Sequence, residues 1–392
     1  MNIRNFDDLK KYIKENSHVK RCIVRCDLNL PSDIEDLTRI YAIKDTVREL
    51  LNLDLNVVLV SHYKRPKTED IIDPKYSLAS IAPKVSQVLG CDVDFIKYSI
   101  FDIEPEIIKS RLTLMQNLRF YEGETKNDLE LAERLAKFGD VYINDAFSVS
   151  HRAHASVAKI AELLPSFAGL SLSREIEGIS KVTHNITRPF TAIIGGSKVS
   201  SKIDVLKQIS QTADYLIVTG AMANTFLAAK GFDLKNSLIE KEQFNLCNEI
   251  LEKSKAEIIL PVDFTASVDI NTNGSNYDLD KIPDGFACFD IGEKTTANII
   301  EILLKSKTLL WNGALGAFEF ANFNKSSKAV TKIIADRTKS HELISVIGGG
   351  ETVASISGYK DDMTFVSTAG GAFLEFVAGY ILPGIAVLQK NN

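Results

Sequence analysis

Three short glycine-rich segments in the second half of the chain have the composition of phosphate-binding turns. Each follows an apolar run, and the three segments are Gly195-Gly196, Gly348-Gly349-Gly350 and Gly370-Gly371. Glycine lets backbone N–H groups approach an anion, and a helix that begins at such a turn adds the positive end of its dipole. Any one of these segments is also typical of an ordinary strand-to-helix loop. Three with the same pattern together predict a nucleotide-binding site.

The first half of the chain carries charged and imidazole side chains where the second half carries glycine. Such side chains follow four predicted strands, and with Arg39 the set is Asp27, Asn29, His62, Arg65, Arg119, Asp145, His151, Arg152 and His154. Guanidinium groups bind phosphate and carboxylate groups bidentately. Surface ion pairs with Asp and Glu are the alternative for any single arginine. The accumulation of arginines and histidines at several strand ends favours a site for a small, multiply charged anion.

Lysines and one carboxylate accompany the glycines. Lys198 and Lys202 are four residues apart, which predicts that they share one face of a helix after Gly195-Gly196. Opposite a triphosphate they would be point charges on the transferring group, although a solvated helix face is the alternative. Glu351 would suit Mg²⁺, or would simply be a carboxylate favoured by a helix N-terminus. The chemistry that needs both a small anion and a nucleotide is phosphoryl transfer.

The elements that must position these residues alternate along the chain. Amphipathic stretches such as Asp128–Phe138 and Ser201–Gln211 separate short apolar runs, which is the βαβ pattern of parallel sheets covered by helices. The predicted strands are Cys22–Cys26, Val57–Ser61, Leu112–Met115, Val141–Ile143, Thr191–Ile194, Tyr215–Val218, Ile258–Leu260, Thr308–Leu310, Leu343–Ile347 and Phe365–Val366. So many strands predict an α/β protein with two Rossmann-like doubly wound parallel-sheet domains, whose ligands bind beyond the carboxyl ends of the strands.

A polar break near residues 168–188 predicts the domain boundary. We expect a first domain over residues 1–170, a hinge helix and linker over 171–188, and a second domain over 189–377. The hinge helix is predicted over Gly169–Lys181. The polar, turn-rich stretch Asp269–Asp284 is expected to be a surface excursion.

Composition narrows the class of protein. The chain has 392 residues, of which 45% are hydrophobic and 25% charged, and its net charge of −5 argues against wholesale binding of nucleic acid. The five cysteines are scattered without a C-x-x-C pair, which fits reduced thiols, and Cys22 and Cys26 are expected to pack in the core. The N-terminus lacks the pattern of a signal peptide, and no window approaches the roughly 20 apolar residues of a membrane span. We therefore expect a cytoplasmic protein.

The motifs, taken in order, resemble those of the phosphoglycerate kinase family. The resemblance is colinear from about residue 20 to 388 and rests on Arg25-Cys26-Asp27-Leu28-Asn29-Leu30-Pro31, Thr38-Arg39-Ile40, Ser61-His62-Tyr63-Lys64-Arg65-Pro66, Asn117-Leu118-Arg119-Phe120, Asn144-Asp145-Ala146-Phe147, His151-Arg152-Ala153-His154-Ala155-Ser156, Gly195-Gly196-Ser197-Lys198-Val199-Ser200, Trp311-Asn312-Gly313, Phe318-Glu319, the segment around Gly350-Glu351-Thr352 and Ser367-Thr368-Ala369-Gly370-Gly371.

This resemblance implies the reversible reaction of 1,3-bisphosphoglycerate and ADP to give 3-phosphoglycerate and ATP, with Mg²⁺. It implies that the first domain, with a C-terminal tail over residues 378–392, binds phosphoglycerate through Asp27, Leu28, Asn29, Arg39, His62, Tyr63, Lys64, Arg65, Arg119 and Arg152. It implies that the second domain binds the nucleotide through Lys202, Asn312, Glu319, Gly348, Gly349, Gly350, Glu351 and Thr352, with Glu319 at the ribose and Glu351 at the metal.

The resemblance also assigns the catalytic groups. Arg39, Lys198 and Lys202 would stabilise the transferring phosphoryl group, assisted by the backbone of Gly370 and Gly371. Position and charge suffice because the acyl phosphate is already activated, and closure of a hinge would exclude water. We expect a monomer that binds neither membranes nor nucleic acid.

Several residues depart from the pattern of the family. Glu351 stands in place of Asp, Ser148 and Ala369 in place of Gly, Ser201 in place of Asp, and Ala314 in place of Pro. The longer Glu351 side chain is expected to alter the metal site, and Ser148 to crowd the substrate. The hypothesis of an active kinase therefore stands beside that of a binding or regulatory protein with little turnover. An NAD-linked dehydrogenase is a third hypothesis, but the chain has no G-x-G-x-x-G after a strand.

Overall fold

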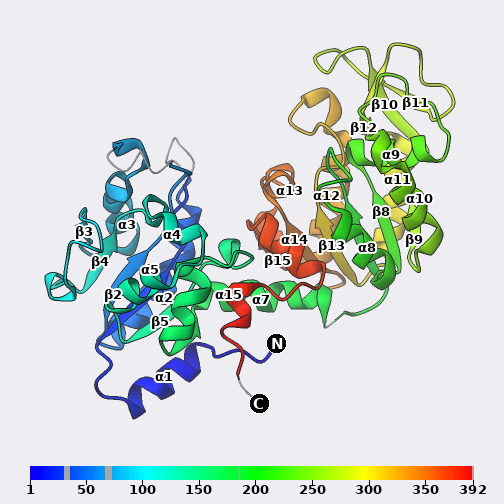
Figure 1. The fold of residues 1–392 in the computed structure, drawn as a ribbon. Coiled ribbons are helices and arrows are strands. Elements are labelled where there is room, and N and C mark those ends of the chain that lie inside the picture. The colour runs from blue at the N-terminus through cyan, green and yellow to red at the C-terminus, as the bar shows by residue number, and fades with distance from the viewer. Residues whose placement is uncertain (31–35, 67–72, 185, 391–392) are drawn as a thin grey trace. The chain divides into compact units, whose positions relative to one another are not determined.

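The computed structural model describes residues 1–30, 36–66, 73–184 and 186–390 (Figure 1). It divides into two compact units. The first unit comprises residues 1–176 and the C-terminal segment from Ile381, and the second comprises Glu177–Tyr380. The predicted α/β fold with two doubly wound parallel sheets is confirmed, because each unit is built on a sheet of six parallel strands.

The sheet of the first unit has the strand order β3-β4-β2-β1-β5-β6. Its strands are β1 (Arg21–Arg25), β2 (Asn56–Val60), β3 (Asp94–Ile96), β4 (Leu112–Met115), β5 (Val141–Asn144) and β6 (Ser166–Ala168). The chain leaves β1 towards β2 and later returns to the other side of β1 with β5. The strand order therefore reverses between β1 and β5, and ligands bind beyond the carboxyl ends of the strands at such a point.

Helices cover both faces of this sheet and create two core layers. The helices are α1 (Phe6–Glu15), α2 (Thr38–Asn52), α3 (Ala82–Leu89), α4 (Glu122–Thr125), α5 (Leu129–Ala136), α6 (Ile160–Leu163), α7 (Leu170–Thr183), which runs into the second unit, and α15 (Pro383–Ala386). Because side chains alternate across a strand, Cys22 and Val24 pack with α1, α2 and α3, whereas Ile23 packs with α5 and α6. Cys22 and Cys26 are both fully buried in the first of these layers, which confirms their predicted place in the core.

The sheet of the second unit has the order β15-β14-β13-β7-β8-β9. Its strands are β7 (Phe190–Ile194), β8 (Tyr215–Val218), β9 (Glu257–Ile259), β13 (Thr308–Asn312), β14 (Ile344–Gly348) and β15 (Phe365–Ser367). Its helices are α8 (Ile203–Thr212), α9 (Gly220–Ala229), α10 (Phe244–Lys253), α11 (Glu293–Lys305), α12 (Lys325–Lys339), α13 (Gly350–Ser355) and α14 (Gly371–Val377). Here the strand order reverses between β7 and β13, so the glycines after these two strands lie at the switch point.

A small antiparallel sheet in the second unit adds strands to the predicted set. The strands β10 (Asp263–Ser267), β11 (Ser275–Asp278) and β12 (Ala287–Ile291) pair in the order β11-β10-β12. The stretch Asp269–Asp284 lies largely at the surface, as predicted, but it contains β11, a strand that is missing from the predicted set. The strand was missed because its side chains are polar and half-exposed to exposed, so the apolar alternation that marks a strand is absent.

The C-terminal segment adds to the first unit. The amide of Arg4 donates to the carbonyl of Leu388 at 2.8 Å, and an isolated bridge pairs Ile3 with Gln389. The side chains of Ile385 and Leu388 are fully buried. The last helix of the chain is thus part of the core of the unit that contains the N-terminus. Among the described residues, every helix is too short or too polar to cross a bilayer.

Candidate functional site

A fully buried arginine lies beneath the switch point of the first unit. Arg25 is the last residue of β1, and its Nε donates to Oγ of Ser156 at 2.9 Å. That hydroxyl donates to Oε1 of Glu124 at 2.6 Å, and the amide of Ser156 donates to Oε2 of Glu124 at 3.0 Å. Glu124 is itself fully buried. A buried cation is stable only with compensation, and the polar chain through Ser156 to Glu124 supplies it.

Arg25 also fixes the state of His62. Its Nη2 lies 3.2 Å from Nδ1 of His62. Burial and the charge of Arg25 hold the pKa of His62 well below its usual value, although Asp27 opposes the shift. Because the guanidinium can only donate, Nδ1 must accept, and the imidazole proton lies on Nε2. His62 is therefore a neutral hydrogen-bond donor at the carboxyl end of β2.

Two further histidines are neutral for the same reason. Burial, followed by the charges of Arg119, Arg25 and Arg152, lowers the pKa of His154 to about 3. Burial and Arg152 likewise lower the pKa of His151. The predicted convergence of arginines and histidines thus has an electrostatic consequence: burial and then the charges of the arginines lower the pKa values of the imidazoles and keep them uncharged. The cluster is strongly cationic and suits an anion.

Asp27 and Arg39 form an ion pair at the same switch point. Nη1 of Arg39 and Oγ of Ser148 both donate to Oδ2 of Asp27, and the amide of Asn29 donates to Oδ1 at 3.0 Å. Burial alone would raise the pKa of Asp27, but the Arg39 guanidinium and the Ser148 hydroxyl help to lower it to about 2. Asp27 is therefore ionised at neutral pH and holds Arg39 by charge.

The strand-end segment from Ser61 to Lys64 is held by Asn117. Nδ2 of this buried side chain donates to the carbonyls of Tyr63 and Tyr76 at 2.7 and 2.8 Å, and its Oδ1 accepts from the amides of Tyr63 and Arg119. The strand ends that carry His62 and Arg119, two of the four with predicted anion-binding residues, are thereby fixed to one side-chain amide. Asn117 is a positioning residue that sequence reasoning did not include among the site residues.

Not every predicted phosphoglycerate-binding residue offers a side chain to the cluster. Leu28 and Tyr63 are buried in the core layer with α2 and α3. Lys64 has a left-handed backbone (φ +55°), and its amide donates to Oδ1 of Asn29 at 2.7 Å. Arg65 is exposed, whereas Arg119 and Arg152 are half-buried. Leu28 and Tyr63 thus position the polar residues next to them.

Glycines at the switch point of the second unit interlock. A Cβ at Gly195 would lie 2.1 Å from the carbonyl oxygen of Ala314, and a Cβ at Gly313 would lie 2.1 Å from that of Gly195. Gly313 also has a φ of +93°. Only glycine fits such an approach of two backbones. The carbonyl of Ala314 accepts from the amide of Gly196 at 3.2 Å, a bond that does not depend on the side chain at position 314.

Lys202 reaches into this pair of turns. Its Nζ donates to the carbonyl of Gly195 at 2.7 Å and lies 3.4 Å from that of Asn312. Burial lowers the pKa of Lys202 to about 8, and the charge of Glu351 opposes the shift. In the free protein at slightly alkaline pH, a substantial fraction of the Lys202 side chains is therefore uncharged. An incoming phosphate would favour its charged form.

The prediction that Lys198 and Lys202 share one face of a helix is wrong. The helix α8 begins only at Ile203, and both lysines belong to the preceding turn, in which Lys198 is exposed. The hydroxyl of Ser201 donates to the carbonyl of Lys198 at 2.8 Å, and Ser200 donates through its hydroxyl to Glu240. These side chain–backbone and side chain–side chain bonds hold a compact turn in place of a first helical turn. The ammonium group of Lys202 therefore bonds to the glycine turn, whereas Lys198 is exposed to solvent.

The turn after β14 has the predicted form, because α13 begins at Gly350 and Gly349 takes the left-handed conformation with φ +92°. The hydroxyl of Thr352 accepts from the amide of Gly313 at 2.6 Å and donates to the carbonyl of Gly348 at 2.9 Å. Nδ2 of Asn312 donates to the same carbonyl at 2.7 Å. Asn312 and Thr352 thus hold two strand ends together, while the exposed Gly350 leaves its surface free for a ligand.

The carboxylate of Glu351 is compatible with a magnesium ion that arrives with a nucleotide. Glu351 is exposed in the first turn of α13. Among the described residues there is no group of three His, Cys, Asp or Glu that could hold a metal by itself. Mg²⁺ is usually held by one or two carboxylates together with phosphate oxygens, so a single glutamate beside a phosphate site is consistent with it.

A cavity of about 330 Å³ lies beside Lys202. It is lined by the turn and first residues of α8 on one side and by α14 on the other, including Lys202, Asp204, Gly371, Leu374 and Tyr380. The helix α14 begins at Gly371, within the third of the glycine-rich segments. This cavity therefore brings together two of the predicted phosphate-contacting segments, the one around Lys202 and the one around Gly371.

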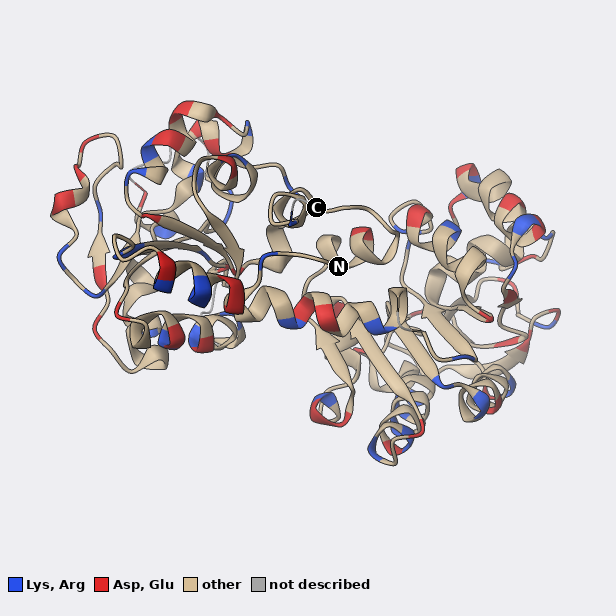
Figure 2. Ribbon diagram, turned by 90° about the horizontal axis from the view of Figure 1, so that it is seen from below, with Lys and Arg blue, Asp and Glu red and all other residues tan. Residues whose placement is uncertain are grey.

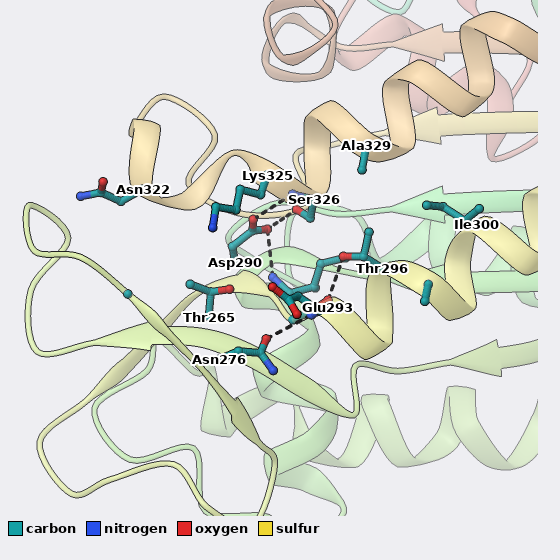
Figure 3. Close-up of a pocket in the computed structure, with 14 residues that line it drawn as sticks. Thr265, Asn276, Asp290, Glu293, Thr296, Ile300, Asn322, Lys325, Ser326 and Ala329 are labelled. Carbon is teal, nitrogen blue, oxygen red and sulfur yellow. Dashed lines mark hydrogen bonds between the residues drawn. The ribbon is translucent and has the colours of Figure 1, made fainter.

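A second cavity, of about 370 Å³, lies between the antiparallel sheet and the first turns of α11 and α12 (Figure 3). Asp290 projects to the start of α12, where it accepts from the hydroxyl of Ser326, and burial raises its pKa to about 7. At α11 the amide of Glu293 donates to Oδ1 of Asn276 at 3.1 Å. The amide of Ser326 also donates to Oδ2 of Asp290 at 3.4 Å, so an N–H group at each helix start has a protein acceptor. Asp290 also packs against Gly316, and so supports the loop that carries the exposed Glu319.

The structure therefore groups most of the predicted residues by unit. In the first unit the electrostatic partners include Asp27, Arg39, His62, Arg65, Arg119 and Arg152. In the second unit the glycine turns, Lys202, Asn312, Thr352 and Glu351 lie around the ends of β7, β13 and β14. Sequence reasoning missed the supporting roles of Arg25, Glu124, Asn117 and Ser156. Arg25, the charged residue in the predicted strand Cys22–Cys26, was the one signal that a buried partner had to exist.

Comparison with known proteins identifies what this arrangement resembles. The family model described as phosphoglycerate kinase matches residues 13–380. The phosphoglycerate kinase of Brucella abortus is 41% identical over 404 residues and covers 100% of both chains, and that of Mesorhizobium japonicum is 43% identical over 385 residues, covering 95% of this chain and 96% of its own.

Solved structures agree with the sequence matches. The phosphoglycerate kinase of Coxiella burnetii superposes with a TM-score of 0.86 at 34% identity, covering 95% of this chain and 97% of the other. That of Pyrococcus horikoshii superposes with a TM-score of 0.82 at 30% identity, covering 98% of each chain.

Proposed function

The chain belongs to the phosphoglycerate kinase family, and from this premise we propose which of its residues bind the ligands and transfer the phosphoryl group. The reaction is the reversible phosphoryl transfer between 1,3-bisphosphoglycerate and ADP that gives 3-phosphoglycerate and ATP in glycolysis. In the direction of ATP synthesis, the bond between phosphorus and the carboxyl oxygen breaks, and a bond from phosphorus to the terminal oxygen of ADP forms. The earlier alternative of an NAD-linked dehydrogenase is set aside.

We propose that the first domain, residues 1–170 with the tail over 378–392, binds the phosphoglycerate. Arg65, Arg119 and Arg152 bind its phosphate and carboxylate groups, and His62 donates a hydrogen bond to it from Nε2. Asp27, Asn29 and Lys64 shape the strand ends around it, and Leu28 and Tyr63 place these neighbours. The cationic cluster with neutral histidines supports this assignment, because a compact anion would offset the repulsion among Arg25, Arg119 and Arg152.

We propose that the second domain, residues 189–377, binds the nucleotide, and that residues 171–188 form the hinge between the two. The phosphates lie on Gly348, Gly349 and Gly350 and near Lys202, with Glu319 at the ribose and Asn312 and Thr352 holding the turns. Glu351 holds Mg²⁺ on the phosphates, and this ion supplies charge neutralisation there when it is bound. The capped starts of α11 and α12 support the placement of the phosphates at the glycine turns.

The transfer needs position and charge rather than a covalent intermediate, because the acyl phosphate is already activated. Arg39, Lys198 and Lys202 stabilise the negative charge of the transferring group, and the amides of Gly370 and Gly371 assist them. One observation carries this assignment. The ion pair with Asp27 holds the guanidinium of Arg39 in a fixed place within the cationic cluster.

We also propose a cytoplasmic monomer that binds neither nucleic acid nor membranes. Figure 2 shows acidic and basic residues interspersed along the helices of both units, and the net charge is −5. Binding to nucleic acid generally needs a basic patch or stripe. The five free cysteines, three of them buried, fit a reducing compartment.

The assignment of the catalytic cations is tested with single variants in a coupled activity assay. Arg39→Ala and Lys198→Ala are each expected to lower kcat by about a thousandfold, the effect of removing a cation from a phosphoryl-transfer site. The matched controls are Arg48→Ala on α2 and Lys207→Ala on α8, which remove exposed cations from the same regions and should keep the activity. Thermal melting shows whether each variant is folded. Near-wild-type turnover of both Arg39→Ala and Lys198→Ala would overturn the assignment.

A further inference from the structure

Ser148 stands where the family pattern has glycine, and its hydroxyl has a specific partner. It lies in a short 3₁₀ segment (Phe147–Val149) that follows β5. Because β1 and β5 are neighbouring parallel strands, the residues that follow them meet at the switch point. There Oγ of Ser148 donates to Oδ2 of Asp27, a residue 121 positions earlier in the chain.

The oxygen that Ser148 contacts is the one that holds Arg39. Nη1 of Arg39 donates to the same Oδ2, whereas Oδ1 accepts from the amide of Asn29 at 3.0 Å. Asp27 is 9% exposed, so water has little access to it. The terminal torsion of an aspartate is soft, and its carboxylate rotates unless donors hold both oxygens. Asn29 holds one oxygen, and Ser148 is the neutral donor that holds the other.

We propose that Ser148 is a positioning residue for the phosphoryl transfer. Its hydroxyl keeps the Asp27 carboxylate turned towards Arg39, and the carboxylate in turn keeps the guanidinium where the transferring group passes. The inference rests on the proposed function, because it takes Arg39 to be the group that meets the phosphoryl. Ser148 thus supplies, through Asp27, a side-chain support for Arg39 that a glycine at this position would lack.

The inference makes Ser148 act through Asp27 and Arg39, which separates it from a purely steric role. A serine that only filled space would affect folding or substrate affinity whether or not Arg39 were present. A serine that orients Asp27 has no effect on catalysis once Arg39 has been removed. A double-mutant cycle between positions 148 and 39 measures this difference.

The experiment compares Ser148→Ala, Ser148→Thr, Arg39→Ala and the double variant Ser148→Ala/Arg39→Ala in the coupled assay. Ser148→Ala is expected to lower kcat by about tenfold, as for a lost hydrogen bond to a charged group, with KM for 3-phosphoglycerate nearly unchanged. Ser148→Thr keeps the hydroxyl and should retain most of the activity. In the Arg39→Ala background, Ser148→Ala should have no further effect.

Three results would each overturn the inference: wild-type kcat for Ser148→Ala, a threonine variant as slow as the alanine variant, or the same tenfold loss with and without Arg39. If Ser148→Ala does not fold, Ser148→Cys gives the same comparison, since a thiol is a weak donor of similar size. Wild-type turnover of Arg39→Ala would instead refute the proposed role of Arg39, together with the inference built on it. An inactive Arg39→Ala beside a fully active Ser148→Ala refutes the inference alone.

Discussion

At the scale of single residues, buried charges decide which groups of this protein can bind an anion. Arg25 is fully buried and remains stable through Ser156 and Glu124. Burial and the charge of Arg25 keep His62 neutral, so the imidazole can donate from Nε2 to a ligand without adding to the repulsion among the arginines. The buried polar chain thus serves the site by setting a protonation state.

Lys202 gives a pH-dependent prediction at the same scale. Burial lowers its pKa to about 8, and bound phosphates would raise it. Above pH 8 the free protein has lost this proton, so binding of ADP must take it up, and the affinity should fall by up to about tenfold per pH unit, the limit for one proton. Titration calorimetry between pH 7 and 9.5, in buffers of different ionisation enthalpy, measures both the affinity and the proton uptake.

The control is a second lysine of the same segment. Lys202→Met should abolish the proton uptake above pH 8, whereas Lys207→Met, an exposed position on α8, should leave it intact. An affinity for ADP that stayed constant between pH 7 and 9.5 in the wild-type protein would contradict the assignment of Lys202 to the phosphates.

At the scale of elements, the two switch points use different chemistry on the same architecture. Between β1 and β5 the strand ends carry charged side chains, which are held by Asp27, Arg25 and Glu124. Between β7 and β13 the strand ends carry glycines, whose backbones approach within contact distance. The first arrangement presents side chains to a ligand and the second presents backbone, which is the difference expected between a small anion site and a phosphate-binding turn.

The interlocked glycines predict a large effect of a single methyl group. Gly313→Ala places a Cβ 2.1 Å from the carbonyl oxygen of Gly195 and requires a left-handed alanine at φ +93°. Strain and overpacking together should lower the free energy of unfolding by roughly 2–5 kcal/mol and weaken ADP binding. Urea denaturation and calorimetry measure the two effects.

Gly358→Ala is the matched control for this variant. Gly358 has nearly the same φ, +88°, but a Cβ there would meet nothing within 4 Å. Gly358→Ala should lower the free energy of unfolding by only about 1–2 kcal/mol, through backbone strain alone, and leave ADP binding unchanged. Equal losses of stability in the two variants would show that the approach of the two turns is unimportant.

At the scale of the whole molecule, the two compact units are not two continuous halves of the sequence. The C-terminal segment from Ile381 returns to the unit that contains the N-terminus. Asn144 at the end of β5 donates through Nδ2 to the carbonyl of Gly384 at 2.9 Å, and Arg4 donates to the carbonyl of Val387 at 2.7 Å. The strand end that precedes Ser148 is therefore supported by residues 240 positions later.

Truncation after Tyr380 tests this organisation. It removes three nearly or fully buried side chains, Leu382, Ile385 and Leu388, each with a burial free energy of about 1.5–3 kcal/mol. The first unit should lose at least about 5 kcal/mol of stability, while the second unit keeps its affinity for ADP. Denaturation monitored by limited proteolysis measures the stability of each unit separately.

A point variant in the same segment provides the comparison. Lys390→Ala removes only the partly exposed ion pair with Asp8 and should change the stability by less than about 1 kcal/mol. Should the truncated protein retain the full stability of its first unit, the tail would not belong to the core of that unit.

The sequence by itself determined the fold class, the family and the kind of group at each strand end. Strands such as Leu112–Met115 and Tyr215–Val218 were predicted with their observed bounds, because a local run of apolar residues marks a short buried strand. The motifs around Arg39, His62 and Gly348 are local as well. Polar β11 and the turn before α8 were not predictable in this way, since pairing with β10 and bonds from Ser200 to Glu240 hold them.

Tertiary structure alone decided which of these groups meet. That Arg25 faces His62, that Ser148 reaches Asp27 and that Lys202 turns inward while Lys198 stays exposed all depend on which strands are neighbours. The partners are separated by 37 and 121 residues in the first two cases. A hydrogen bond or a pKa shift acts over a few ångströms of space, and the order of strands in a sheet, not the order of residues in the chain, sets that distance.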